Sequence, residues 1–306
     1  MIAKRIPWII AALLIVPQPL LALRAEDLLK QSQDVDKRVS YRGLKTVNVY
    51  FAHDLTSAAI KVLHLKPNKT RTEYFAPPLL AGIIVIQDGS GVWRYSPSDG
   101  RWEKTCGYQP APDEQIRREA FANYDFSIVG SDKVAGRPVH VVRAIPKRKG
   151  EPARTIWLDK EFHLALRTSV ETDTGAVVNS SKYTYIEFNP KDISAAAFRI
   201  PKTVSKPPQP KDADFGIIKP KYLPDGYKAI GMSRLTVNGR TCVHLQFSNG
   251  ANTISLFERA SDKKSARTSM KSKFTNVLTW AQGGVLFTLI GDLSKSELEK
   301  IADSIK

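Results

Sequence analysis

The chain has 306 residues, of which 42% are hydrophobic, and it carries a formal net charge of +16 at pH 7. This length suits about two domains of roughly 100 to 200 residues each, and the hydrophobic content is sufficient for packed cores. A class of small proteins that need disulfides or metals in order to fold is therefore excluded. The positive charge favours anionic partners, and in a cytoplasmic protein it would first indicate nucleic acid. The N-terminus argues against that class.

Residues 1–25 have the pattern of a secretory signal peptide. A basic pair at 4–5 precedes an apolar stretch over 6–16, and Ala22 and Ala25 offer cleavage sites. The apolar stretch is shorter than the roughly 20 residues that a membrane span needs, although an uncleaved N-terminal anchor stays an alternative. We therefore expect a periplasmic or otherwise extracytoplasmic protein. In that compartment we expect its positive charge to favour binding to acidic lipid headgroups, anionic envelope polymers or an acidic protein segment. The alternative is that the Lys and Arg side chains simply form a solvated surface.

The first part of the mature chain reads as one helix followed by antiparallel strands. Over residues 26–39, Leu28, Val35 and Val39 recur at helical spacing opposite a charged face. Strands are predicted at 44–52, 58–65, 71–75, 80–86 and 92–95, with another near Trp102. The run 80–86 is almost wholly apolar, as in a strand covered on both faces. We expect the aromatic-rich run 71–102 to form the sheet that every neighbouring segment covers or extends.

An irregular insertion over 110–123 carries a short charged helix, after which strands resume. These later strands are predicted at 124–129, 137–145, 154–159, 164–172 and 177–188. Parallel strands need crossover segments, and none are present. Residues 26–200 therefore predict a single large, strongly curved antiparallel sheet with few helices.

A second domain is predicted over 215–306, after a Pro- and Lys-rich connector over 201–214. Its strands are expected at 227–237, 241–247, 253–259, 276–281 and 285–290, and two Asn-Gly pairs mark hairpin turns. The basic, Ser-rich segment 261–273 is predicted to be a mobile loop. Ser294 and Glu297 form a capping box for a closing helix, which makes this a small α+β domain.

Several motifs resemble the RseB/MucB family of extracytoplasmic regulators of envelope-stress sigma factors. They are Tyr41-Arg42-Gly43, Val92-Trp93-Arg94-Tyr95, Trp157-Leu158-Asp159 and Phe198-Arg199-Ile200-Pro201 in the large domain, and Leu223-Pro224-Asp225-Gly226-Tyr227 and Leu289-Ile290-Gly291-Asp292-Leu293 in the small one. The resemblance implies an α+β, mainly antiparallel β protein. Its large domain, 26–200, would be a half-open LolA-like β-barrel covered by helices, and 215–306 would be the family's small C-terminal domain.

The sequence contains no enzyme signature. The five histidines lie in unrelated segments, and HExxH, GxSxG and phosphate-binding glycine loops are absent, although a triad assembled only in three dimensions stays open. Cys106 and Cys242 form no CxxC and have no metal-ligand spacing with any histidine, so we expect two unpaired thiols and neither metal nor cofactor.

These observations together predict a non-enzymatic extracytoplasmic regulator. It would bind an amphiphile, such as a lipid, lipoprotein or acyl group, in a hydrophobic cavity and control an anti-sigma factor or similar envelope-stress membrane protein, with no nucleic acid partner. The alternatives are a periplasmic lipid or lipoprotein carrier of LolA type and a hydrolase of envelope material. A curved sheet under few helices tends to leave an apolar cavity. The predicted lining residues are Val47, Val49, Phe51, Phe75, Ile84, Ile86 and Trp93.

Overall fold

The computed structural model describes residues 23–51, 54–98, 100–104, 114–172, 175–201, 216–237, 240–261, 268–271 and 276–305. Most of the predicted signal peptide and nearly all of the predicted connector lie outside the described residues, so both remain predictions. Within the described part, no helix has the length and apolar character that crossing a membrane requires.

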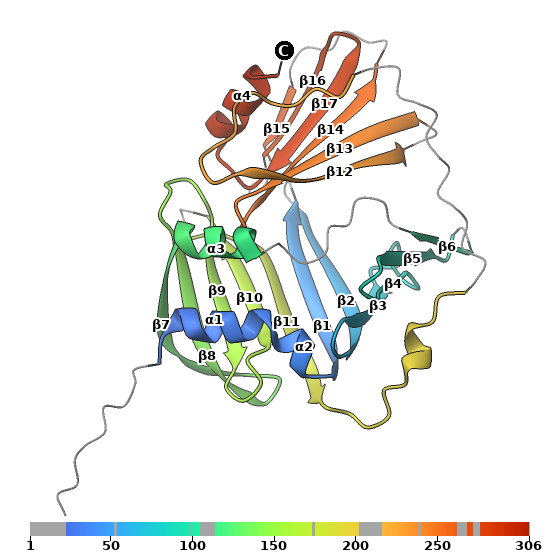
Figure 1. Ribbon diagram of the computed structural model, residues 1–306, viewed down its shortest axis with the longest axis vertical. Coiled ribbons are helices and arrows are strands. Elements are labelled where there is room, and N and C mark those ends of the chain that lie inside the picture. The colour runs from blue at the N-terminus through green and yellow to red at the C-terminus, as the bar shows by residue number, and fades with distance from the viewer. Residues whose placement is uncertain are drawn as a thin grey trace, which may run out of the picture.

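The large domain is an antiparallel sheet of 11 strands in the order β6-β5-β4-β3-β2-β1-β11-β10-β9-β8-β7 (Figure 1). The strands are β1 (Tyr41–Phe51), β2 (Asp54–Leu65), β3 (Lys69–Ala76), β4 (Ile84–Gln87), β5 (Val92–Ser96), β6 (Arg101–Lys104), β7 (Tyr124–Val134), β8 (Arg137–Pro146), β9 (Ala153–Asp159), β10 (Ala165–Glu171) and β11 (Val177–Phe188). The prediction of a mainly antiparallel β fold is confirmed. However, the run 71–102 supplies β3 to β6, which form one edge of the sheet, while the centre is the non-local pair β1 and β11.

The apolar run 80–86 is a strand only in its second half, which corrects the prediction. Residues 77–82 form a turn, in which the amide of Leu80 donates to the carbonyl of Pro77 at 2.8 Å. Gly82 has a φ of 82°, which a side chain would disfavour, and the chain enters β4 only at Ile84. Pro77 and Pro78 have no amide hydrogens to donate to a neighbouring strand, so a turn forms here despite the hydrophobic pattern.

Two N-terminal helices, α1 (Ala25–Gln33) and α2 (Val35–Arg38), cover one face of the large sheet. Figure 1 shows α1 crossing the strands β7 to β10. Leu28 and Leu29 on its inner face pack against Val142 and Leu158. The predicted helix over 26–39 is thus confirmed, with a break at Asp34, and its apolar face anchors it to the sheet. The short helix α3 (Glu114–Asn123) is also confirmed, and a 3₁₀ turn, η1 (Ala195–Phe198), lies beside β3.

The small domain is a six-stranded antiparallel sheet in the order β12-β13-β14-β17-β16-β15. Its elements are β12 (Lys228–Val237), β13 (Arg240–Ser248), β14 (Thr253–Ala260), β15 (Thr268–Lys271), β16 (Asn276–Gln282), β17 (Val285–Gly291) and α4 (Lys295–Asp303). The Ser294 side chain accepts from the Glu297 amide at the start of α4, as the capping box predicted, and Leu298 and Ile301 of this helix are fully buried. The segment 261–273 was predicted to be a mobile loop, but its described part includes β15, which pairs with β16.

Candidate functional site

The two domains meet at a polar joint that begins with the turn between β13 and β14. The side chain of Asn249 accepts hydrogen bonds from the amides of Ala251 and Asn252 at 3.1 and 2.8 Å, and the Ser248 hydroxyl donates to the Asn252 carbonyl at 2.7 Å. Asparagine favours such turns because its short side chain can bond the backbone two or three residues ahead. The turn is therefore held by its own side chains, and the Asn249 and Asn252 amide groups face the large domain.

The carboxylate of Glu151, in the large domain, accepts hydrogen bonds from these amide groups. This residue is 4% exposed, and its carboxylate accepts from Asn249 Nδ2 at 3.1 and 3.3 Å and from Asn252 Nδ2 at 3.0 Å. Asn252 Nδ2 also donates to the hydroxyl of Tyr124 at 2.9 Å, and that hydroxyl donates to the Pro152 carbonyl at 3.2 Å. Burial raises the pKa of Glu151, and the Asn249 donor opposes the rise. Because buried polar groups are costly when unpaired, this network determines how the domains join.

Arg154 on β9 makes the second connection. Its Nη2 donates to the Ala251 carbonyl at 2.6 Å and to Asn252 Oδ1 at 2.7 Å. At the rim, Arg148 forms an ion pair with Asp225 at 3.2 Å. The Asp225 side chain is fully exposed, so this rim pair contributes little compared with the buried network.

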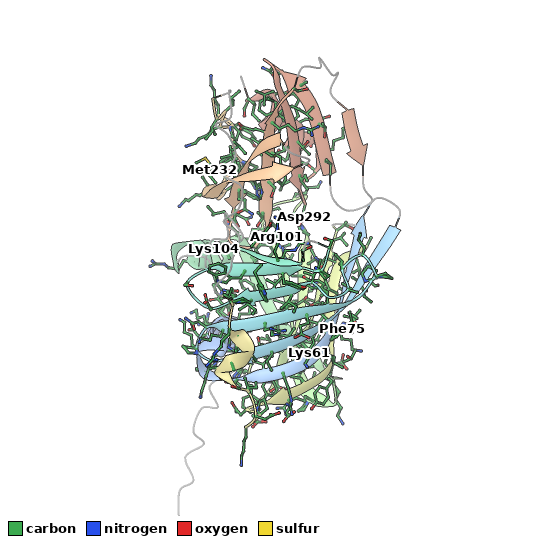
Figure 2. All side chains as sticks on the ribbon, turned by 90° about the vertical axis from the view of Figure 1, so that its right-hand side faces the viewer. Lys61, Phe75, Arg101, Lys104, Met232 and Asp292 are labelled. Carbon is green, nitrogen blue, oxygen red and sulfur yellow. The ribbon has the colours of Figure 1, made fainter. Side chains whose placement is uncertain are left out.

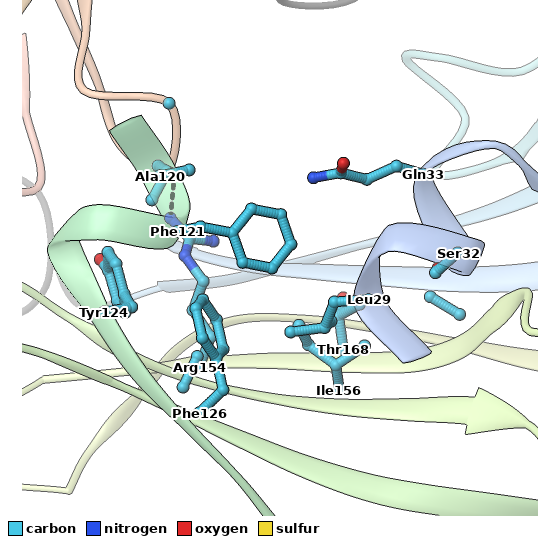
Figure 3. A pocket seen from close by; sticks show the side chains of 14 residues that line it. Leu29, Ser32, Gln33, Ala120, Phe121, Tyr124, Phe126, Arg154, Ile156 and Thr168 are labelled. Carbon is cyan, nitrogen blue, oxygen red and sulfur yellow. Dashed lines mark hydrogen bonds between the residues drawn. The ribbon is translucent and has the colours of Figure 1, made fainter. Parts of the chain in front are cut away.

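A cavity of about 330 Å³ lies directly beside this joint (Figure 3). The large sheet forms its floor, α1 and α3 form its sides, and the small domain's turn closes one end. It is lined by Leu29, Ser32, Gln33, Ala120, Phe121, Tyr124, Phe126, Ala144, Arg154, Ile156, Ala165, Thr168, Gly250 and Ala251. Its volume lies at the lower end of the range for small-molecule sites, roughly 300 to 1,000 Å³.

Strand register explains how the floor is made. Phe126, Ala144 and Arg154 occupy one row across β7, β8 and β9, and Ile156 pairs with Thr168 in the next row. The small side chain of Ala144 between two large ones leaves the floor hollow. Figure 3 shows the Phe121 ring projecting from α3 toward α1, where it approaches the Phe126 ring to 5.2 Å between centroids. The lining is thus mainly apolar, with few polar groups at its ends.

The predicted lining residues lie elsewhere, and the register divides them between two faces. Val47 pairs with Ala58, on the face that carries Ile60 and Tyr74. The ladder through Lys61 and Leu63 leads instead to Ile84, Ile86 and Trp93, which therefore lie on the opposite face. The Phe75 side chain is 53% exposed (Figure 2), so it does not line an enclosed interior. The side chains of Val49 and Phe51 lie outside the described residues.

None of the five predicted residues whose side chains are described lines the cavity beside the joint, so the ligand contacts of all seven remain a prediction. The sequence did contain partial signals for the actual lining. Leu29 lies on the apolar face of the predicted first helix, and Asn249-Gly250 was identified as a turn, although not as part of a site. Nothing in the local pattern of Phe121 or Phe126 distinguishes a cavity wall from ordinary core.

Metal and thiol chemistry find no support in the described part of the chain. No group of three His, Cys, Asp or Glu side chains there could hold a metal ion. Cys242 is a free, buried thiol whose pKa is raised by burial, while Cys106 lies outside the described residues. The expectation of two unpaired thiols therefore stays a prediction.

Comparison with known proteins shows what the large domain is similar to. Residues 85–208 match the MucB/RseB N-terminal domain, and residues 261–305 match a domain of unknown function, DUF4367. The resemblance to the RseB/MucB family is confirmed. The sigma-E factor regulatory protein RseB of Escherichia coli K12 is 24% identical over 190 residues, which are 60% of this chain and 59% of that protein. The counterpart from Haemophilus influenzae is 22% identical over 190 residues, or 60% of each chain. The chain therefore spans about 59% of the length of the first curated relative that it matches.

Solved structures extend the likeness to both domains. MucB in the Pseudomonas aeruginosa MucA/MucB complex has a TM-score of 0.66 at 18% identity, covering 92% of this chain and 98% of that one. Another crystal structure of MucB has a TM-score of 0.64 at 17% identity, covering 92% of this chain and 97% of that one. At this identity the likeness shows a shared fold. The named curated relatives are regulatory proteins.

Proposed function

We propose that this chain is a non-enzymatic regulator of the periplasm or another extracytoplasmic compartment. It binds an amphiphile in a hydrophobic cavity and controls an anti-sigma factor or a similar envelope-stress membrane protein. The large sheet would act as a half-open barrel of the LolA type, with α1 and α3 as its cover. The domain boundaries at 26–200 and 215–306, with a signal peptide over 1–25, belong to the same proposal.

One observation carries the proposal: the cavity is built by both domains. Its floor and sides come from the large domain, while Gly250 and Ala251 of the small domain close one end. A ligand in this cavity therefore contacts the joint that determines how the domains meet. A carrier needs only a cavity, whereas a regulator needs the ligand to change a second surface, and ligand binding can do so only if it favours one arrangement over another.

The partner is proposed from likeness and charge. The structure of MucB was solved in complex with the periplasmic part of MucA, and the shared fold covers 92% of this chain. The net charge of +16 suits an acidic extracytoplasmic segment, because complementary charge speeds and orients association. We therefore propose that both domains contact one such segment of the host's own anti-sigma factor.

The test uses residues 26–306 and the purified extracytoplasmic segment of that anti-sigma factor. We expect binding in biolayer interferometry, and we expect dodecanoate to lower the apparent affinity. Residues 26–200 and 215–306, each shown to be folded by circular dichroism, should each bind more weakly than the whole chain. If no form of the protein binds the segment but residues 26–200 transfer lipid or lipoprotein between membranes, the carrier alternative is correct.

A further inference from the structure

Arg154 is the one charged side chain among the described residues that line the cavity. It rises from β9 in the same row as Phe126 and Ala144, so its aliphatic part lies along the apolar floor. Its guanidinium ends where the floor meets the small domain's turn (Figure 3). No carboxylate within the described part of the chain lies within ion-pair distance of it. The nearby Glu151 carboxylate attracts it through space, but its hydrogen bonds come from Asn249 and Asn252 and its ion pair, at 3.9 Å, is with Arg148.

The donors of this guanidinium are used unequally. Both hydrogens of Nη2 are taken by the small domain, one by the Ala251 carbonyl and one by Asn252 Oδ1. The Nε hydrogen is buried and has no partner among the described residues. A buried N–H donor without a partner is unfavourable, because the hydrogen bond that it made to water in the unfolded chain is not replaced. Such a group favours an anion that can reach it.

The shape of the guanidinium then links that anion to the joint. Nε–H and one hydrogen of Nη2 point the same way along one edge of the planar group, and carboxylates and phosphates bind such an edge with two parallel hydrogen bonds. An anion that takes both donors must displace either Ala251 or Asn252 from Nη2. The ligand and the small domain therefore compete for the same donor.

We propose that Arg154 selects an amphiphile with a carboxylate or phosphate head and, through this competition, couples its binding to the domain joint. This inference rests on the proposed function. The alkyl chain of the ligand lies against Leu29, Phe121 and Ile156, and its head pairs with Nε and Nη2 of Arg154. Binding loosens the turn over 249–252, and the coupling is reciprocal, so loosening the turn raises affinity for the ligand.

The first test compares four molecules with the same chain and different heads on residues 26–306. Dodecanoate and dodecyl phosphate carry anionic heads, dodecanol a neutral one and dodecyltrimethylammonium a cationic one. All are titrated calorimetrically below the concentration at which they form micelles. Because charge-assisted pairs are stronger than neutral ones, we expect both anions to bind at least about tenfold more tightly than dodecanol. The ratio of the two anions tells carboxylate from phosphate as the preferred head.

Variants assign the preference to Arg154. Arg154→Met should bind all four molecules with similar affinity. Arg154→Lys should keep part of the preference for anionic heads, because lysine keeps the positive charge but lacks the two parallel donors of the guanidinium. Lys30→Met is the matched control, because the Lys30 ammonium lies 5.9 Å from the Phe121 ring beside the cavity but is not among the groups that line it. Lys30→Met should behave as the wild type. Equal binding of dodecanol and dodecanoate by the wild type, or an unchanged preference in Arg154→Met, overturns the proposal.

Hydrogen exchange tests the coupling. Dodecanoate should speed exchange of the amides at 251 and 252 in the wild type, while dodecanol should not. Anion preference without this change would mean that Arg154 selects the head but does not transmit its binding, which overturns the second half of the proposal. A different result would contradict the proposed function. That result is that none of the four molecules binds, or that ligand leaves partner binding unchanged.

Discussion

Glu258 on β14 is a carboxyl group in the core of the small domain, and replacing it should remove a loss of stability that occurs as the pH rises. Its side chain is fully buried, and its strand neighbours are Val243 on β13 and Phe287 on β17. Oε2 accepts from the amide of Ile218 at 3.2 Å, while Oε1 has no partner among the described residues. Burial raises the pKa of Glu258 from 4.5 to about 7.

The sign and size of the effect follow from these values. Because the folded-state pKa lies above the unfolded one, the folded state holds the proton more tightly. The contribution of Glu258 to stability is fully present below pH 4.5 and is lost as the pH rises through about 7. At about 1.4 kcal/mol per pKa unit, the difference between 4.5 and about 7 corresponds to roughly 3 kcal/mol. Glu258→Gln keeps an oxygen for Ile218 and cannot ionise.

The assay is urea unfolding of residues 26–306 at pH 5 and pH 8.5, with hydrogen exchange of β17 amides reporting the small domain by itself. Because part of the effect is already lost at pH 5, we expect Glu258→Gln to gain roughly 2 to 3 kcal/mol relative to the wild type between these two pH values. Glu299→Gln is the control, since its exposed pair with Lys295 at 3.6 Å should change stability by less than about 1 kcal/mol at either pH. A difference between Glu258→Gln and wild type that does not vary with pH would refute the reasoning.

Three further predictions concern the joint, the cavity and the thiol. Replacing Glu151 by Ala leaves the Asn249 and Asn252 donors without their acceptor, which should cost about 1 to 3 kcal/mol and separate the two domains' transitions in calorimetry; a single unchanged transition would contradict this. Ile156→Asp should abolish binding of a fluorescent fatty-acyl probe with an unchanged circular dichroism spectrum, because an unpaired charge is disfavoured in an apolar site; if Ile84→Asp abolishes it and Ile156→Asp does not, the lining predicted from sequence is the correct one. In a Cys106→Ser variant, Cys242, 5% exposed, should resist Ellman's reagent in the native protein and react after denaturation, and a fast native reaction would disprove its burial.

Local pattern and chemistry determined most of the elements. The alternation around Val47 and the run 58–65 predict β1 and β2 because successive strand residues face opposite sides. The capping box at Ser294 and Glu297 predicts the start of α4 because it pairs the helix's first unpaired amides. The prediction failed at residues 80–82, where hydrophobicity favours a strand but Pro77, Pro78 and Gly82 favour a turn.

The position of each strand and the composition of the cavity were decided only by tertiary structure. Strand β1 pairs with β11 across more than a hundred residues of chain, and this pairing places the run 71–102 at the sheet's edge. Register then puts Ile84 and Ile86 on the face opposite Val47, because shifting a strand by one residue exchanges its two faces. Leu29, Phe121 and Ala251 meet around the cavity from a helix, an insertion and a second domain. Their proximity depends on long-range packing, which the pattern of neighbouring residues does not encode.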